Sequence, residues 1–163
     1  MKKIIPFALA AATLFAAPAY AQETGASANF AGPRVGAVVG FADDDFAGTE
    51  SFTYGANVGY DFDLGNAIVG VTGEYQDSDD SGRELALVAR AGAPVGSQAL
   101  VYGLAGYSNL GSGTGFHLDG VRVGAGVEVA VSPNVFLNLE QRYSNYEAGV
   151  DGFQTVAGLG FRF

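Results

Sequence analysis

Charged residues recur at every second position of several segments, and their types favour ion pairing over catalysis. Arginine keeps its proton at physiological pH, so it neutralises a carboxylate but does not act as a general base. The alternating positions hold five arginines and five carboxylates, a nearly neutral set. We predict that these side chains form Arg–carboxylate clusters. They are Arg34, Arg90, Arg122, Arg142 and Arg162, with Asp61, Asp63, Glu74, Glu128 and Glu140.

Two sets of residues could be assembled into a hydrolytic site. Asp77, Ser78 and His117 are the types found in a Ser/His/Asp triad, which acts by geometry rather than by sequence order. The segment Arg142-Tyr143-Ser144-Asn145 is similar to the His-x-Ser-Asn motif of outer-membrane lipid A deacylases, but arginine replaces the histidine that would act as general base. Solvated loops and a structural strand explain both sets, so we expect no catalytic residue.

Two acidic segments, Asp43-Asp44-Asp45 and Asp77-Ser78-Asp79-Asp80, offer the carboxylate oxygens that divalent cations prefer. Neither has the spacing of an EF-hand, so we interpret them as solvated loops that share the cations bridging neighbouring lipopolysaccharide molecules. No glycine-rich segment follows a strand and opens a helix, which excludes a phosphate-binding loop. We therefore expect no cofactor and no metal site. The formal net charge of −9 also disfavours nucleic acid as a partner.

The N-terminus has the pattern of a secretory signal peptide. Two lysines precede an apolar stretch, and small residues flank Tyr20 before the expected cleavage between Ala21 and Gln22. Residues 1–21 are thus predicted to direct export, and residues 22–163 to form one domain. Removal of the two lysines changes the net charge from −9 to −11. The exported domain has no cysteine, so disulfides cannot stabilise it.

Eight segments place apolar residues at every second position, which predicts β-strands with one apolar face. Short turns follow the second, fourth and sixth segments, whereas longer acidic or Gly/Ser-rich loops follow the odd-numbered ones. Short periplasmic turns and longer external loops are typical of transmembrane β-barrels. The predicted strands span residues 33–41, 52–63, 67–76, 84–93, 99–109, 121–131, 135–146 and 153–163.

We therefore predict an all-β fold: an eight-stranded antiparallel up-and-down transmembrane β-barrel, whose last strand pairs with its first so that no edge meets lipid. The interior of such a barrel is wide enough only for side chains, so its charges must be paired. Strand direction divides the charged residues into three levels. Arg34, Asp61, Asp63 and Arg162 are predicted near the periplasmic end, Arg90, Glu128 and Glu140 near the middle, and Glu74, Arg122 and Arg142 toward the outside.

Outward-facing aromatic residues fall near segment ends, as in the aromatic girdles of membrane barrels. In the fifth strand both faces are nearly apolar; we predict that Leu100, Tyr102 and Leu104 face outward, since the opposite face is richer in small residues. Gln141 is a polar exception on the lipid-facing side, near a loop. The predicted girdle residues are Phe41, Phe52, Tyr54, Tyr60, Phe62, Tyr75, Tyr143 and Phe153.

The chain resembles the small OmpA/OmpX-like and opacity-protein-like outer-membrane β-barrels, a porin-like domain family. The resemblance rests on the signal peptide, on residues 139–144, which are similar to the family's Glu-Tyr-Arg-Tyr strand, and on residues 158–163. It implies that the barrel-assembly machinery recognises the terminal strand through Phe161 and Phe163, after periplasmic chaperones have delivered the chain. Outer-membrane lipid and lipopolysaccharide are the other expected partners, and we expect a monomer.

We predict an outer-membrane protein with a structural or surface-interaction role and no enzymatic activity. The first alternative is a narrow passive ion channel, in which the lumen charges form a rearrangeable gate. The second is a lipid-modifying outer-membrane enzyme. No peptidoglycan-binding domain is expected after the barrel. The sequence identifies no ligand, because external loops vary independently of the barrel that carries them.

Overall fold

A computed structural model of the protein describes residues 29–44, 49–78, 82–111 and 117–163. The expected signal peptide, with its cleavage site at Ala21 and Gln22, lies outside the described residues, as do Asp45, Asp79 and Asp80 of the acidic loops. In the described part of the chain, no helix is long and apolar enough to cross a membrane.

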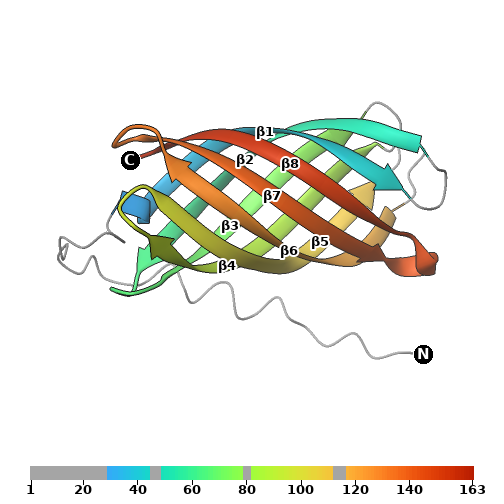
Figure 1. The fold of residues 1–163 in the computed structure, drawn as a ribbon. Helices are drawn as coiled ribbons and strands as arrows, with labels where there is room; N and C mark the ends of the chain where they lie inside the picture. Colours follow the sequence, from blue (N-terminus) through green and yellow to red (C-terminus); the bar gives the residue numbers. More distant parts are fainter. Residues whose placement is uncertain (1–28, 45–48, 79–81, 112–116) are drawn as a thin grey trace.

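The described residues form eight β-strands that close into one antiparallel barrel (Figure 1). Each strand pairs with the next along the chain, and β8 pairs with β1, so the predicted up-and-down barrel is confirmed. A short 3-10 helix, η4 (Glu147–Gly149), lies between the last two strands. The strands are β1 (Gly32–Asp44), β2 (Thr49–Asp63), β3 (Ile68–Ser78), β4 (Arg83–Val95), β5 (Ala99–Gly111), β6 (His117–Ala130), β7 (Val135–Tyr146) and β8 (Asp151–Arg162).

The two ends of the barrel differ in their connections. We call the end with the short β2–β3, β4–β5 and β6–β7 connections the turn end, on the left in Figure 1, and the opposite end the loop end. At the loop end the strands run further than predicted, with β1 reaching Asp44 and β6 beginning at His117. Apolar alternation fades there, but backbone pairing does not need it, and the ladder continues to Gly111 opposite His117.

The seam that closes the barrel is continuous between β1 and β8. It runs from Arg34, opposite Arg162, to Asp44, opposite Gly152. A further backbone bond extends it, because the Phe163 N–H donates to the carbonyl oxygen of Pro33 over 3.0 Å. No strand edge of the seam is therefore left unpaired at the terminal residue. This matters in a bilayer, where an unpaired backbone group has no water to bond.

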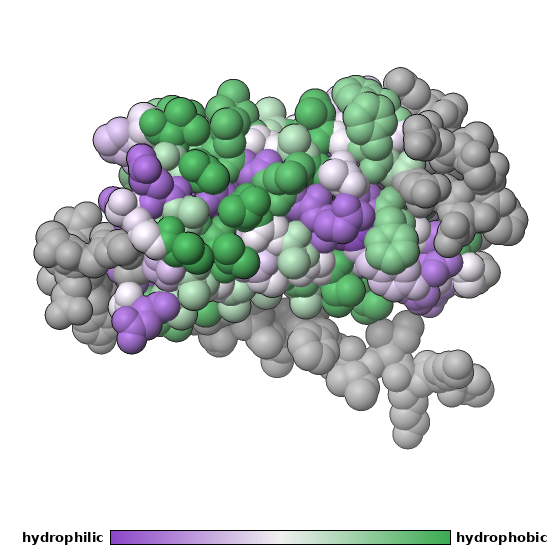
Figure 2. Space-filling model, in the orientation of Figure 1, coloured by the Kyte–Doolittle hydropathy of each residue, from purple (hydrophilic) through white to green (hydrophobic). Residues whose placement is uncertain are grey.

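Side chains alternate between the lumen and the outer wall along the strands. In β4, for example, Glu84 and Arg90 are buried, whereas Leu85 and Leu87 are exposed on the outside. Figure 2 shows the outcome on one face, where hydrophobic residues cover much of the wall of the barrel. The inverted distribution, with polar groups inside and apolar groups outside, is the one that suits a lipid environment.

The predicted orientation of β5 is wrong. Leu100, Tyr102 and Leu104 face the lumen, with exposed fractions of 0%, 3% and 8%, and the alternate residues, including Val101 and Tyr107, face outward. The reason lies on the neighbouring strand β6, whose inward positions opposite Tyr102 and Leu104 are glycines. A methyl group at Gly126 would press on the ring of Tyr102, and one at Gly124 on Leu104. Small residues inside β6 thus require large ones inside β5.

An apolar plug, which the sequence analysis did not predict, fills the lumen at the turn end. Phe30, Ile68 and Leu100 are fully buried there and belong to one hydrophobic cluster. Phe30 precedes β1, and two hydrogen bonds hold its neighbour Asn29. The Asn29 side chain donates to the Ser97 carbonyl oxygen over 3.2 Å. The Arg162 guanidinium donates to the Asn29 carbonyl oxygen over 3.0 Å.

The aromatic residues predicted for the girdles lie on the outer wall, and most of them pair with another ring. Tyr107 adds a further outward ring that the wrong orientation of β5 had hidden. The polar exception Gln141 is also exposed, and its amide oxygen accepts a hydrogen bond from the hydroxyl of its cross-strand neighbour Thr155 over 2.7 Å. The paired rings, with centroid distances, are Phe41–Phe52 (5.5 Å), Phe52–Tyr54 (6.4 Å), Tyr143–Phe153 (5.0 Å), Tyr60–Phe62 (4.7 Å) and Phe161–Phe163 (5.0 Å).

We predict that Gly160→Ala destabilises the folded barrel, because the added methyl group would overlap the ring of Phe136 in the lumen. Overpacking of this kind costs about 1–3 kcal/mol. The matched control is Gly103→Ala on the outer wall, where the nearest atom, the Gly124 carbonyl oxygen, lies 3.8 Å from the added carbon. Urea titrations read by heat-modifiable gel mobility give the unfolding midpoints. Equal midpoints for the two variants would contradict the prediction.

Candidate functional site

Above the plug lies a group of buried charges that we call the turn-side cluster: Arg34, Asp61, Arg90, Glu128 and Arg162. Arg90 bridges the two carboxylates, with Nε donating to Asp61 Oδ1 and Nη1 to Glu128 Oε2, both over 2.8 Å. Arg162 Nη2 donates to Glu128 Oε1 over 2.6 Å. Arg34 Nε lies 3.3 Å from Asp61 Oδ2. In this cluster, two carboxylates hold three guanidinium groups.

Aromatic rings offset the excess positive charge of the turn-side cluster. The guanidinium carbons of Arg162 and Arg34 lie 4.9 Å and 5.9 Å from the ring centroid of Phe136. The guanidinium carbon of Arg90 lies 4.8 Å from the centroid of Tyr102. A cation over the face of an aromatic ring is attracted by the ring's negative face, and the attraction is stronger when water is excluded. The rings therefore take the place of a missing third carboxylate.

Further toward the loop end lies a second group of buried charges, the loop-side cluster: Glu74, Glu84, Arg122, Glu140 and Arg142. Arg142 binds Glu74 with both terminal nitrogens, over 2.7 Å and 2.8 Å, and its Nε donates to Glu140 Oε2 over 2.7 Å. Arg122 donates to Glu84 and, over 3.2 Å, to Glu74. Here three carboxylates hold two guanidinium groups, so the excess charge is negative.

Hydroxyl and amide donors compensate the extra carboxylate of the loop-side cluster. The Tyr102 hydroxyl donates to Glu140 over 2.6 Å. Glu84 accepts from the hydroxyls of Ser108 and, over 2.5 Å, of Tyr146. A buried carboxylate that is hydrogen-bonded in this way avoids much of the cost of leaving water. The corrected orientation of β5 is essential to this arrangement, because both Tyr102 and Ser108 belong to that strand.

The two clusters differ from the sequence-based prediction in membership and in level. Asp63 lies outside them: at the end of β2 it accepts the backbone N–H of Gly65 over 2.7 Å and so stabilises the turn. Glu84 takes its place. The alternation of apolar residues in β4 already puts Glu84 on the inward face, but the predicted clusters did not include it. Arg90 and Glu128, predicted near the middle, bond within the turn-side cluster. Long arginine side chains reach along the axis, so strand level does not determine the partner.

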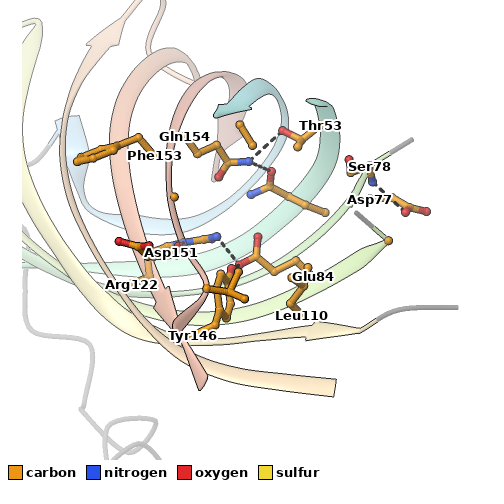
Figure 3. Close-up of a pocket in the computed structure, with 16 residues that line it drawn as sticks. Thr53, Asp77, Ser78, Glu84, Leu110, Arg122, Tyr146, Asp151, Phe153 and Gln154 are labelled. Carbon is orange, nitrogen blue, oxygen red and sulfur yellow. Dashed lines mark hydrogen bonds and ion pairs between the residues drawn. The ribbon is translucent and has the colours of Figure 1, made fainter. Parts of the chain in front are cut away.

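The packed lumen leaves a small inner cavity of about 20 Å³ between the clusters, lined by residues of both, including Arg34 and Glu140. A larger cavity of about 90 Å³, which we call the outer vestibule, lies beyond the loop-side cluster at the loop end. Figure 3 shows Glu84, Arg122 and Tyr146 on one side of the vestibule and Gln154 across from them. The side chains of Gln154, Thr53 and Gln76 are hydrogen-bonded to one another there.

The residues considered for hydrolytic chemistry are not arranged for it. His117 begins β6, whereas Asp77 and Ser78 end β3, and β4 and β5 lie between these strands. Ser144 is buried, and its hydroxyl oxygen accepts a hydrogen bond from Arg122 Nε over 3.0 Å. The neighbouring Arg142 is committed to two carboxylates. Among the described residues, no group of three or more His, Asp or Glu side chains is placed to hold a metal ion.

We predict that Glu128→Gln strongly destabilises the barrel, because the arginines of the turn-side cluster would then share Asp61 alone. Removing one partner of a buried ion pair costs about 3–5 kcal/mol. Glu147→Gln is the matched control, since Glu147 is exposed in η4. Urea unfolding of the refolded protein, followed by far-ultraviolet circular dichroism, measures the free energy of unfolding. A loss no larger than that of the control would be inconsistent with a structural role for the cluster.

Solved structures of small outer-membrane barrels have the same fold. The N-terminal β-barrel domain of OprF from Pseudomonas aeruginosa aligns with a TM-score of 0.61 and 20% identity, covering 82% of this chain and 99% of that one. Ail of Yersinia pestis aligns with a TM-score of 0.57 and 17% identity, covering 80% of this chain and 96% of that one. Neisserial surface protein A aligns with a TM-score of 0.56 and 19% identity, and the alignment also covers 80% of this chain and 96% of that one. At these identities the likeness establishes the fold. No curated protein matches the chain.

The family described as Outer membrane protein beta-barrel domain matches residues 7–163, nearly the whole chain. The structure has the features that such a domain needs in lipid: a closed strand ladder, an apolar outer wall with aromatic pairs near its ends, and a polar lumen whose charges are paired. This chain therefore belongs to the outer-membrane β-barrel domain family.

Proposed function

We propose that this outer-membrane β-barrel has a structural or surface-interaction role and that its lumen does not conduct ions. The observation that carries the proposal is the continuous filling of the lumen by buried side chains. Phe30, Ile68 and Leu100 close the turn end, and every member of the two charged clusters is at most 8% exposed. The inner cavity of about 20 Å³ has room for about one water molecule, too little for a hydrated ion.

The described strand ends at the loop end support a surface role, because they carry polar side chains that are hydrogen-bonded to one another. On the β5–β6 hairpin, Asp119 accepts hydrogen bonds from the Tyr107 hydroxyl over 2.5 Å and from the Asn109 amide over 2.6 Å. We further propose that carboxylates at this end share the divalent cations that bridge lipopolysaccharide, which would anchor the barrel laterally. Export through residues 1–21 is part of the same proposal.

A narrow ion channel is the second candidate, and one observation favours it. The clusters are not neutral individually, and a cavity lined by Arg34 and Glu140 lies between them. An arginine that exchanged carboxylates across this cavity would change the path through the lumen. The plug at the turn end argues against a permanent pore, so the channel would also require Phe30 to leave its buried position. A lipid-modifying enzyme has no observation in its favour among the described residues.

We predict that planar bilayers containing the refolded protein show no single-channel steps, for the wild type and for Arg142→Ala and Glu140→Ala alike. Both substitutions open the loop-side cluster, but the turn-side cluster and the plug still close the lumen. Conductance steps in the wild type would overturn the proposal. Steps that arise only in the two variants would favour the gated channel.

The terminal residue is proposed as part of the assembly signal read by the barrel-assembly machinery. Phe163 is exposed on the outer wall and packs edge-on against Phe161. Its backbone N–H already contributes to the seam with Pro33, and that bond does not depend on the side chain. The ring is therefore free to act as a recognition element without being needed for the closed structure.

We predict that Phe163→Ala lowers the amount of folded protein in the outer membrane, while the free energy of unfolding of the refolded barrel, measured by urea titration, stays within about 1 kcal/mol of wild type. The matched control is Phe153→Ala, which removes an exposed ring near the opposite end of β8. Heat-modifiable mobility of outer-membrane fractions gives the cellular amount. An equal reduction in both variants would mean that exposed aromatic area matters and that the terminal position does not.

A further inference from the structure

The outer vestibule contains hydrogen-bond acceptors that neither the ion-pair clusters nor the proposed role uses. We propose that the vestibule binds a primary ammonium group, such as one end of a short aliphatic diamine. Three observations carry this inference: a buried acceptor without a donor, a carboxylate with an unused oxygen, and a negative balance of charge along the walls. Each comes from described residues that line the same cavity.

The first observation concerns Gln154, which is 7% exposed and lines the vestibule. Its amide nitrogen donates to Thr53 Oγ1 and to Gln76 Oε1, both over 2.9 Å. These bonds fix the orientation of the amide, and they leave Oε1 buried with no hydrogen-bond partner in the described part of the chain. In Figure 3 the amide projects into the barrel opening. Buried acceptors almost always have a donor, so this oxygen points to a donor supplied by a ligand.

The second observation concerns Glu84, across the vestibule from Gln154. Within the described residues, Glu84 accepts from Arg122, Ser108 and Tyr146, and all three bonds end on Oε1. The second carboxylate oxygen, Oε2, has lone pairs available for further donors. A ligand lying between Glu84 and Gln154 could therefore donate to both walls at once.

The third observation is electrostatic. Among the described residues that line the vestibule, the charged ones are Glu84, Asp77, Asp151 and Arg122, which leaves an excess of two negative charges. Arg122 is also fully engaged, because its nitrogens donate to Ser144, to Glu74 and to Glu84. An anion would thus meet net repulsion and no free cationic donor, whereas a cation is attracted.

Among cations, an ammonium group fits these acceptors better than a metal ion. A metal needs several carboxylate or imidazole ligands close together, and no such group occurs in the described residues. An ammonium group carries three N–H donors of its own and is satisfied by an amide oxygen, a carboxylate oxygen and water. The cavity of about 90 Å³ has room for several water molecules, which suits an ammonium group with its first methylene groups.

The test uses the complete barrel, refolded in detergent micelles, with 1,4-diaminobutane as the probe. We expect saturable NMR shifts of the backbone amides of Thr53, Gln76 and Gln154, with a Kd of about 1 mM that weakens as salt is added. The control compound 1,4-butanediol has the same chain length but no charge, and it should cause no such shifts. Failure of the wild type to show saturable shifts with the diamine would overturn the proposal.

Two further measurements separate recognition of the N–H donors from simple attraction of positive charge. Gln154→Met keeps the side-chain length but removes the acceptor, so we expect about tenfold weaker binding. Gln141→Met makes the same change on the outer wall and should bind as the wild type does. Equal affinities of Gln154→Met and wild type would refute the assignment.

Discussion

The closed backbone ladder is the constraint on which the rest of this structure depends. Because β8 pairs with β1, the circumference of the barrel is fixed, and every second residue of each strand must fit into a lumen only wide enough for side chains. Charges placed there have no bulk water, so they remain ionised only by bonding to one another. The two clusters thus form because the closed barrel encloses polar residues. Their side chains in turn fill the lumen.

Filling that lumen depends on matching large and small residues between neighbouring strands. Gly160 makes room for the ring of Phe136, and Gly126 makes room for Tyr102. Both rings then face guanidinium groups of the turn-side cluster. The inward glycines therefore affect the stability of the turn-side cluster indirectly. Without the space that they leave, the aromatic rings that offset its third arginine would not fit into the lumen.

Alternation in the sequence was sufficient to predict the strands and, in most of them, the inward face. It placed Glu84 inside, although Asp63 had been preferred as a cluster member. It failed in β5, where both faces are apolar and the choice is made by Gly124 and Gly126 of the next strand. Alternation also could not predict the burial of Phe30, because this residue lies before the first strand, where there is no alternating pattern.

The order of the charge excess along the lumen also has a physical origin. The turn-side cluster has one surplus arginine and the loop-side cluster one surplus carboxylate, and the two attract each other across the cavity lined by Arg34 and Glu140. The reverse order would place surplus carboxylates against the negative faces of Phe136 and Tyr102, which is unfavourable. The aromatic residues at the turn end therefore select positive charge there. The matching negative excess is left at the loop end, where it adds to the carboxylates of the vestibule and makes that end of the lumen attractive to cations.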